Sequence, residues 1–344
     1  MIELRGNQLV FSFTGVHPDA KLTIEFQRTL RIPDDGKKYP LPPGLGAFPV
    51  RDVDDYAKNV PPEWVDHGGV MLPMYQSEAM WILFRSQYLA DRQAAYPFAI
   101  KVAAGKVCAV SGKTWTNDLV AKPQNFVISP NQPWLDGFCV SEGTIRQFVA
   151  MPLGAGYTAE EQVTGKAEHG GLQLLVSPMR REAFDLRFPI RPKSEVSILR
   201  PGFAPRRRAM SKPAEMGLAP GGQMRQQIYA STYPLAEWDT SERSRCFVHI
   251  VNSMVWQSST GQLPPHAPLT AKQYAQLRLP WFDYYDDTVP SLAATSTLTG
   301  LKSVAEIGAE KGDVPLPENE SAEPTNLKHL GPKKRPGEVR QGRF

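Results

Sequence analysis

The chain has little of the chemistry by which enzymes and secreted domains are usually recognised. Its 344 residues include only three cysteines. Cys108, Cys139 and Cys246 lie far apart and form no CxxC pair. An odd, widely spaced set argues against both a disulfide framework and a cysteine-rich zinc site. The motifs GxSxG and HExxH are absent as well, so the sequence shows neither the nucleophile elbow of a serine hydrolase nor the zinc-binding helix of a metalloprotease.

Long apolar runs and a strong net charge are also missing. No apolar stretch approaches the roughly 18 residues of a membrane-spanning helix, and the start MIELRGNQLVFSF lacks the basic and apolar regions of a secretory signal. The formal net charge is only +4, so no overall field draws the chain to a nucleic acid or a membrane. We therefore expect a soluble, cytoplasmic protein without membrane insertion and without a cofactor, in which only local basic segments could contact nucleic acid.

Proline, by contrast, is abundant. The 32 prolines and 27 glycines disfavour long helices, because an interior proline removes a hydrogen bond and clashes with the preceding turn. Apolar runs bounded by turn residues predict hairpins over 9–32, 98–110, 138–151 and 171–190. Short strands at such close spacing are typical of sandwiches and barrels. The sequence thus predicts a mainly β fold: a β-sandwich or jelly-roll-like domain with a small mixed α/β C-terminal segment and a flexible tail.

Changes in composition divide the chain into four parts. Residues 1–199 carry the strand signals, and 200–226 are predicted to be a basic Pro/Gly linker. Residues 227–290 form a mixed segment that we expect to pack on the β domain. Residues 291–344 form a low-complexity tail, too poor in large apolar side chains to offset its ordering entropy. Within the mixed segment, 246–257 is almost continuously apolar, and periodicity does not decide between a buried helix and a buried strand.

Two capping boxes predict short helices. Thr158 with Glu161 begins AEEQVT, and Thr270 with Gln273 begins AKQYAQL. A Pro- and Gly-rich stretch over 33–62 shows no clear element, and long loops of this kind are often functional.

One short pattern occurs twice, as DHGGVML from Asp66 and as EHGGLQL from Glu168. If the pattern is functional, His67 and His169 are metal ligands or general bases, since imidazole suits zinc, copper and iron. The acid before each histidine would then orient its ring.

The alternative is that Gly-Gly supplies the free backbone geometry of a turn into a strand. We favour this interpretation. It predicts that His67 and His169 are more than about 10 Å apart, far beyond the roughly 2 Å at which each nitrogen must lie from a shared metal. A metal or catalytic site would need a third group from His249, Cys139 or an acid, and nothing in the spacing selects one.

Thiols and aromatic side chains supply the remaining candidates. Cys246 and His249 share a face if their segment is a helix but not if it is a strand, and Cys139 is a further candidate nucleophile. Trp134 in QPWLDG and Trp281 in LPWFDYYDD each follow a proline and precede an acid. Such aromatics either anchor loops in a core or bind sugars and proteins from an exposed face. The aromatic residues predicted to bind are Trp134, Trp281 and Tyr284.

These observations favour a non-enzymatic binding or assembly protein. Its extended arms would order on contact with a protein partner, either a second copy or a different protein. The arm residues predicted to bind are Arg206, Arg207 and Arg208. The alternative hypothesis is a metal-assisted enzyme that uses His67 and His169. A third is a carbohydrate-binding protein that uses the two tryptophans named above.

Overall fold

Strands account for most of the regular structure. The computed structural model describes residues 1–190, 215–284 and 290–330. In these ranges 17 strands hydrogen-bond into one sheet, and two further strand pairs stand apart from it. The mainly β prediction is therefore confirmed.

The sheet has two arms. The first is antiparallel throughout. Its strands, in spatial order, are β1 (Ile2–Arg5), β2 (Gln8–Ser12), β3 (Lys21–Thr29) and β8 (Ala79–Ser86), with β5 (Gly44–Ala47) beside β3 and β14 (Trp134–Leu135) beside β8.

The second arm is built around β19 (Ser244–Asn252). This strand pairs in parallel with β7 (Val70–Met74) on one side and antiparallel with β17 (Leu172–Pro178) on the other. The arm continues from β7 to β6 (Arg51–Asp52) and from β17 to β11 (Phe98–Ala104), and β12 (Val107–Cys108) and β13 (Val127–Ser129) extend β11.

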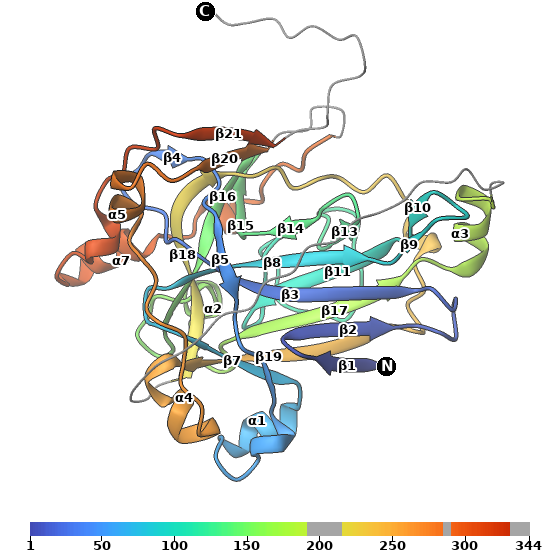
Figure 1. Cartoon of the computed structure of the whole chain (residues 1–344), viewed down its shortest axis with the longest axis horizontal. Helices are drawn as coiled ribbons and strands as arrows, with labels where there is room; N and C mark the ends of the chain where they lie inside the picture. Colours follow the sequence, from blue (N-terminus) through green and yellow to red (C-terminus); the bar gives the residue numbers. More distant parts are fainter. Residues whose placement is uncertain (191–214, 285–289, 331–344) are drawn as a thin grey trace, which may run out of the picture.

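A long strand pair joins the arms. β16 (Thr144–Pro152) pairs with β18 (Glu215–Arg225), and β16 also bonds to β8 while β18 bonds to β19. β15 (Gly137–Ser141) and β4 (Lys38–Tyr39) extend this pair. Figure 1 shows β16 and β18 crossing one end of the long strands.

The helices are short and lie around the sheet. None within the described ranges exceeds eight residues. They are α1 (Pro62–His67), α2 (Ala159–Thr164), α3 (Arg181–Arg187), α4 (Ser253–Thr260), α5 (Ala271–Gln276), α6 (Ser296–Thr299) and α7 (Val304–Lys311), with 3-10 turns η1 (Asp54–Tyr56), η2 (Leu235–Glu237) and η3 (Pro317–Asn319). The two separate strand pairs are β9 (Tyr88–Leu89) with β10 (Ala94–Ala95), and β20 (Trp281–Tyr284) with β21 (Leu327–Leu330). No helix in the described part of the chain is long and apolar enough to cross a membrane.

One apolar core connects both arms. Along β3, Leu22, Ile24 and Phe26 alternate along the strand and are fully buried, as the two-residue period of a strand requires when one face meets a core. The rings of Phe13, which follows β2, and Phe98 of β11 lie 5.9 Å apart. Direct side-chain contact therefore holds the two arms together, in addition to the strands that join them.

The end of the predicted linker over 200–226 is part of the sheet. Residues 215–225 form β18, while 200–214 lie outside the described residues. Proline and glycine normally weaken a strand. Here Pro220 sits opposite Phe148, beside the point at which the register of β16 and β18 shifts, so its missing N–H falls at an irregularity of the ladder.

Two other local predictions are resolved by the structure. The apolar segment 246–257 contains both proposed elements, because β19 ends at Asn252 and α4 begins at Ser253. The strand expected over 184–190 is wrong, since α3 occupies most of that range and β17 pairs with β11 and β19 instead. Both capping boxes are confirmed at the starts of α2 and α5.

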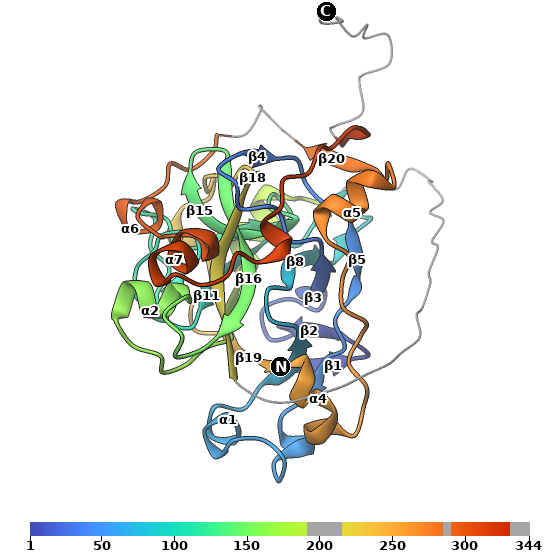
Figure 2. The same cartoon turned by 90° about the vertical axis from the view of Figure 1, so that its left-hand side faces the viewer.

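The segment expected to be a flexible tail contains packed elements in its described part. Residues 291–330 include α6, α7, η3 and β21. Leu298 and Val304 are buried there, and a capping box of Ser303 with Glu306 begins α7. Figure 2 shows α6 and α7 lying against the sheet on the same side as α2.

Substitution of Gly222 in β18 tests how closely this strand approaches the neighbouring backbone. A Cβ there would lie 2.3 Å from the carbonyl oxygen of Pro33, whereas at Gly15 the nearest atom would be 3.8 Å away and neither glycine has a positive φ. We expect Gly222→Ala to lower the free energy of unfolding by about 1–3 kcal/mol through overpacking, and Gly15→Ala to change it by less than about 0.5 kcal/mol. Denaturant unfolding followed by tryptophan fluorescence measures both, and equal stabilities would contradict the tight backbone approach.

Candidate functional site

The two Gly-Gly segments are turns that enter neighbouring strands. The four glycines have φ of 62°, 89°, 56° and 51°, in the region that favours glycine. The turns lead into β7 and β17, which pair with β19 along its opposite edges. A Cβ on Gly69 would lie 2.3 Å from the Phe247 carbonyl oxygen, and one on Gly171 would lie 2.4 Å from that of Val248. The turn interpretation is confirmed, and the second glycine of each pair is required because both turns press against one strand.

The predicted separation of the two histidines is nevertheless wrong. The ring centroids of His67 and His169 are 6.0 Å apart and their planes differ by 22°. His249 of β19 is the third member of this group, with its centroid 6.2 Å from that of His67. The two turns flank the same stretch of β19, so His67 lies between His169 and the strand's own histidine. We call His67, His169 and His249 the histidine cluster; it holds three of the six histidines in the chain.

His249 is the buried member of the histidine cluster. Its ring stacks on Trp64 at a centroid distance of 4.5 Å, and its Nε2 donates a hydrogen bond to the Gly68 carbonyl oxygen at 3.0 Å. Burial, with a smaller contribution from nearby His67, lowers the pKa of His249 to about 4. The ring is therefore neutral at physiological pH.

His169 is held by a carboxylate that the sequence did not single out. Glu160 of α2 is 2% exposed. Its Oε1 lies 3.0 Å from His169 Nδ1, and its Oε2 accepts hydrogen bonds from the backbone N–H groups of His169 and Gly170 at 3.2 and 3.0 Å. The adjacent acid Glu168 is exposed and pairs with Lys166 instead. The capping box located α2, but nothing in the sequence linked its Glu160 to the turn.

The histidine cluster does not form a metal centre in its present arrangement. In the described part of the chain, no three side chains of His, Cys, Asp or Glu are placed to hold a metal ion. The rings of His67 and Phe247 stack with their centroids 4.7 Å apart. The rings of His169 and His249 also lie nearly parallel to the ring of His67. The acid before His67, Asp66, is exposed.

The thiols are poorly suited to nucleophilic catalysis. Cys139 is 1% exposed, and burial raises its pKa to about 11. Burial also raises the pKa of Cys246 to about 12. Cys246 and His249 lie three apart on β19, so they point to opposite faces. Neither thiol is ionised near neutral pH, and a thiolate is the reactive form.

The aromatic candidates have different environments. Trp281 is fully buried and packs against Tyr39 and Tyr274, so it is a core anchor. Trp134 is half-buried, and its ring meets that of Tyr284 edge to face at 5.1 Å. Trp134 also lines a groove of about 220 Å³ with side chains from the Pro-rich stretch. Arg206, Arg207 and Arg208 lie outside the described residues.

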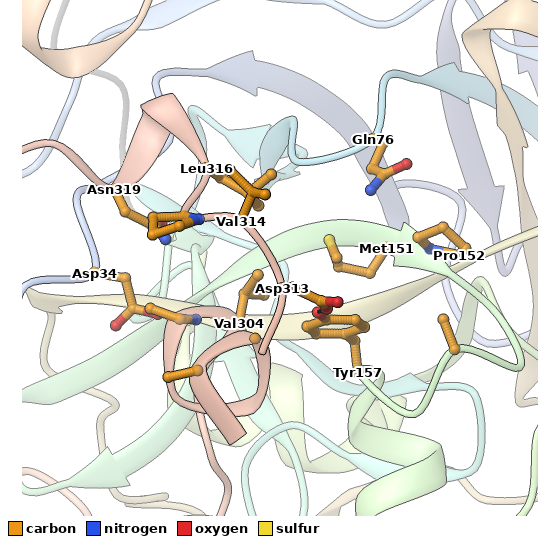
Figure 3. A pocket seen from close by; sticks show the side chains of 15 residues that line it. Asp34, Gln76, Met151, Pro152, Tyr157, Val304, Asp313, Val314, Leu316 and Asn319 are labelled. Carbon is orange, nitrogen blue, oxygen red and sulfur yellow. Dashed lines mark hydrogen bonds between the residues drawn. The ribbon is translucent and has the colours of Figure 1, made fainter. Parts of the chain in front are cut away.

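A larger cavity than this groove lies between the end of β16 and the C-terminal segment. Its volume is about 540 Å³. Figure 3 shows Met151, Pro152 and Tyr157 facing Val304, Val314 and Leu316 across it. The remaining lining residues are Asp34, Gln76, Ala155, Ala305, Gly308, Ala309, Asp313, Pro315 and Asn319.

Polar contacts fix the walls of this cavity, which we call the α7 cavity. Tyr157 donates its hydroxyl hydrogen to the Asp313 carboxylate. Asp34 accepts a hydrogen bond from the Ala305 backbone N–H at 2.9 Å and pairs with Arg146 at 3.5 Å. The carboxylates at its rim are thus already engaged, and most of its lining is apolar.

Comparisons with known proteins supply no relative. No family model, no curated protein and no solved structure matches the chain.

The pKa of His249 leads to a pH-dependent stability. The unfolded ring has an ordinary pKa near 6.5 and the folded ring one of about 4, so the unfolded state binds the proton more tightly. Stability therefore falls as the pH drops from 6.5 towards 4, by roughly 2–3 kcal/mol at about pH 4.5. His249→Gln should remove this loss, and exposed His266→Gln should keep it. Urea unfolding at about pH 7.5 and 4.5 measures the difference; identical pH profiles for all three chains would refute the assignment.

Proposed function

We propose that the protein is a non-enzymatic binding protein whose ligand is a small, largely apolar molecule held in the α7 cavity. The observation that carries the proposal is the cavity itself. Its volume of about 540 Å³ falls within the roughly 300–1,000 Å³ of ordinary ligand pockets, which are mostly apolar with a few polar groups. Among the described candidates, the protonated Cys139 and Cys246 and the neutral, stacked His249 do not favour nucleophilic catalysis.

The fold supports such a role because the cavity has a wall on each side. Met151 belongs to the long β16, which is bonded to both β8 and β18. Val304 and Ile307 of α7 are buried against the same small apolar cluster. We further propose that the two arms of the sheet face each other as layers of a β-sandwich, which the contact of Phe13 with Phe98 supports.

Assembly with a protein partner stays a prediction. One surface on which the C-terminal arm of another copy could lie is the aromatic, acidic segment WFDYYDD. Within one chain, β21 already pairs in parallel with β20, so that Leu327 lies opposite Trp281 and Lys328 opposite Phe282. This intramolecular pairing occupies part of the expected docking surface. Native mass measured over a range of protein concentrations tests whether copies associate in any other way.

Blocking the α7 cavity should weaken binding. Ala155 lines it and is half-buried, so Ala155→Phe places a ring in the space; Ala90 is exposed and outside the cavity, so Ala90→Phe is the matched control. The neutral dye N-phenyl-1-naphthylamine, which brightens in apolar sites, should bind saturably to the native chain and to Ala90→Phe. We expect at least tenfold weaker binding to Ala155→Phe, about 1.4 kcal/mol. Absence of saturable binding, or equal binding by both variants, would remove the proposal.

A transition-metal site at the histidine cluster is the second candidate, and it requires the stacked rings to turn towards a shared ion. The contact of Glu160 with His169 Nδ1 favours it, because metal-bound imidazoles are commonly oriented by a carboxylate on their other nitrogen. This candidate predicts micromolar Zn²⁺ binding by calorimetry that falls at least tenfold in His67→Asn and is unchanged in His266→Asn. Equally weak binding by all three chains would eliminate it.

A further inference from the structure

Arg31 is a buried cation with unused hydrogen-bond donors. It follows β3 and is 2% exposed. Its Nη2 donates to the Asn319 side-chain oxygen at 2.6 Å, but its Nε and Nη1 have no partner among the described residues. Leaving such donors buried and unpaired is costly. Arg31 therefore needs a hydrogen-bond acceptor that the described residues do not supply.

A further cavity is lined in part by Arg31. Its volume is about 190 Å³, and Arg31, Tyr75, Gln76, Glu78 and Glu318 are among the residues that line it. The carboxylate of Glu78 is already occupied, because Arg28 donates to its Oε1 at 2.7 Å and the Tyr75 backbone N–H donates to its Oε2 at 2.9 Å.

Glu318 supplies the complementary group. Its Oε2 is buried and has no hydrogen-bond partner among the described residues. Arg31 and Glu318 influence each other electrostatically, yet they do not form an ion pair within 4.0 Å in this part of the chain. One small cavity is thus lined both by a residue with unpaired buried donors and by a residue with an unpaired buried carboxylate oxygen.

This polar cavity adjoins the α7 cavity. Gln76 lines both, and Asn319, which accepts the hydrogen bond from Arg31, lines the α7 cavity. Figure 3 shows Gln76 and Asn319 at opposite ends of the view, with Leu316 and Val314 between them. A molecule with an apolar body in the larger space could therefore extend a polar head towards Arg31.

We infer that the cavity between Arg31 and Glu318 receives the ligand's head group, and that this head carries a carboxylate and an ammonium, as in an α-amino acid with an apolar side chain. The inference rests on the proposed function. A guanidinium binds a carboxylate through parallel charge-assisted hydrogen bonds, and an ammonium supplies the donor that Glu318 lacks. Each unpaired group is then satisfied by one end of the same zwitterion.

Four probes with similar apolar chains separate the contributions: 1-octanol, octanoate, octylamine and 2-aminooctanoate. Each is measured by displacement of N-phenyl-1-naphthylamine from the native full-length chain. We expect 2-aminooctanoate to bind at least tenfold more tightly than 1-octanol. Arg31→Gln should weaken octanoate and 2-aminooctanoate at least tenfold and leave 1-octanol unchanged. Glu318→Gln should weaken only the two probes that carry an amine.

Glu320→Gln is the control, because Glu320 is exposed and pairs with Lys272 at 2.6 Å; it should change no affinity. If Arg31→Gln does not fold, the half-buried Glu318 still tests the inference through the amine-carrying probes. If neither the dye nor 1-octanol binds, the proposed function itself fails. If both bind but the four probes bind equally, the cavity holds only water and the inference is overturned. It is also overturned if Arg31→Gln weakens all four probes alike, since Arg31 would then act only by supporting Asn319.

Discussion

The contact of two glycine turns with the backbone of β19 is the constraint on which much of the structure depends. Gly69 and Gly171 approach the strand from opposite sides, at distances that leave no room for a Cβ. Each turn fixes the start of a neighbouring strand, and so sets the register of β7 and β17 on β19. As a consequence, His67 is placed beside His249 and His169 beside His67. The histidine cluster is thus explained by backbone packing before any chemistry is required of it.

Elements whose formation depends on close contact with distant backbone could not be predicted from the sequence, whereas elements with a local pattern could. Strands with one face in the core, such as β3, repeat with period two and could be identified from the sequence. β18 could not, because Pro220 and its following glycines are typical of a linker. Their role depends on the irregular register opposite Phe148 and on the backbone next to Pro33, which only the folded chain supplies. Local signals that need no distant partner, such as the capping box of Thr158 and Glu161, were confirmed.

The candidate sites were harder to predict because their residues are distant in sequence. The Gly-Gly turns could be predicted, but their contact with β19 could not, because neither motif indicates the order of the strands in the sheet. Glu160 could be located on a helix, yet its direction towards His169 depends on how α2 packs. Arg31 and Asn319 are 288 positions apart, and one of them belongs to a segment whose composition predicted a tail. The burial of Arg31 is visible only after that segment has packed.

Packing of the C-terminal segment and occupancy of the α7 cavity are parts of one equilibrium if the proposed function holds. α7 is only eight residues long, and helices of that length need tertiary contacts to be stable in water. Val304 and Ile307 provide such contacts on the face next to β16. A ligand between these surfaces would bind only the packed arrangement, and so would stabilise it by about 2.7 kcal/mol at a concentration 100 times its Kd. The polar cavity would act in the same direction, because Glu318 and Asn319 lie in this segment and Asn319 bonds to Arg31. A segment of weak apolar composition can therefore serve as the adjustable wall of a binding site, ordered most firmly when the site is filled.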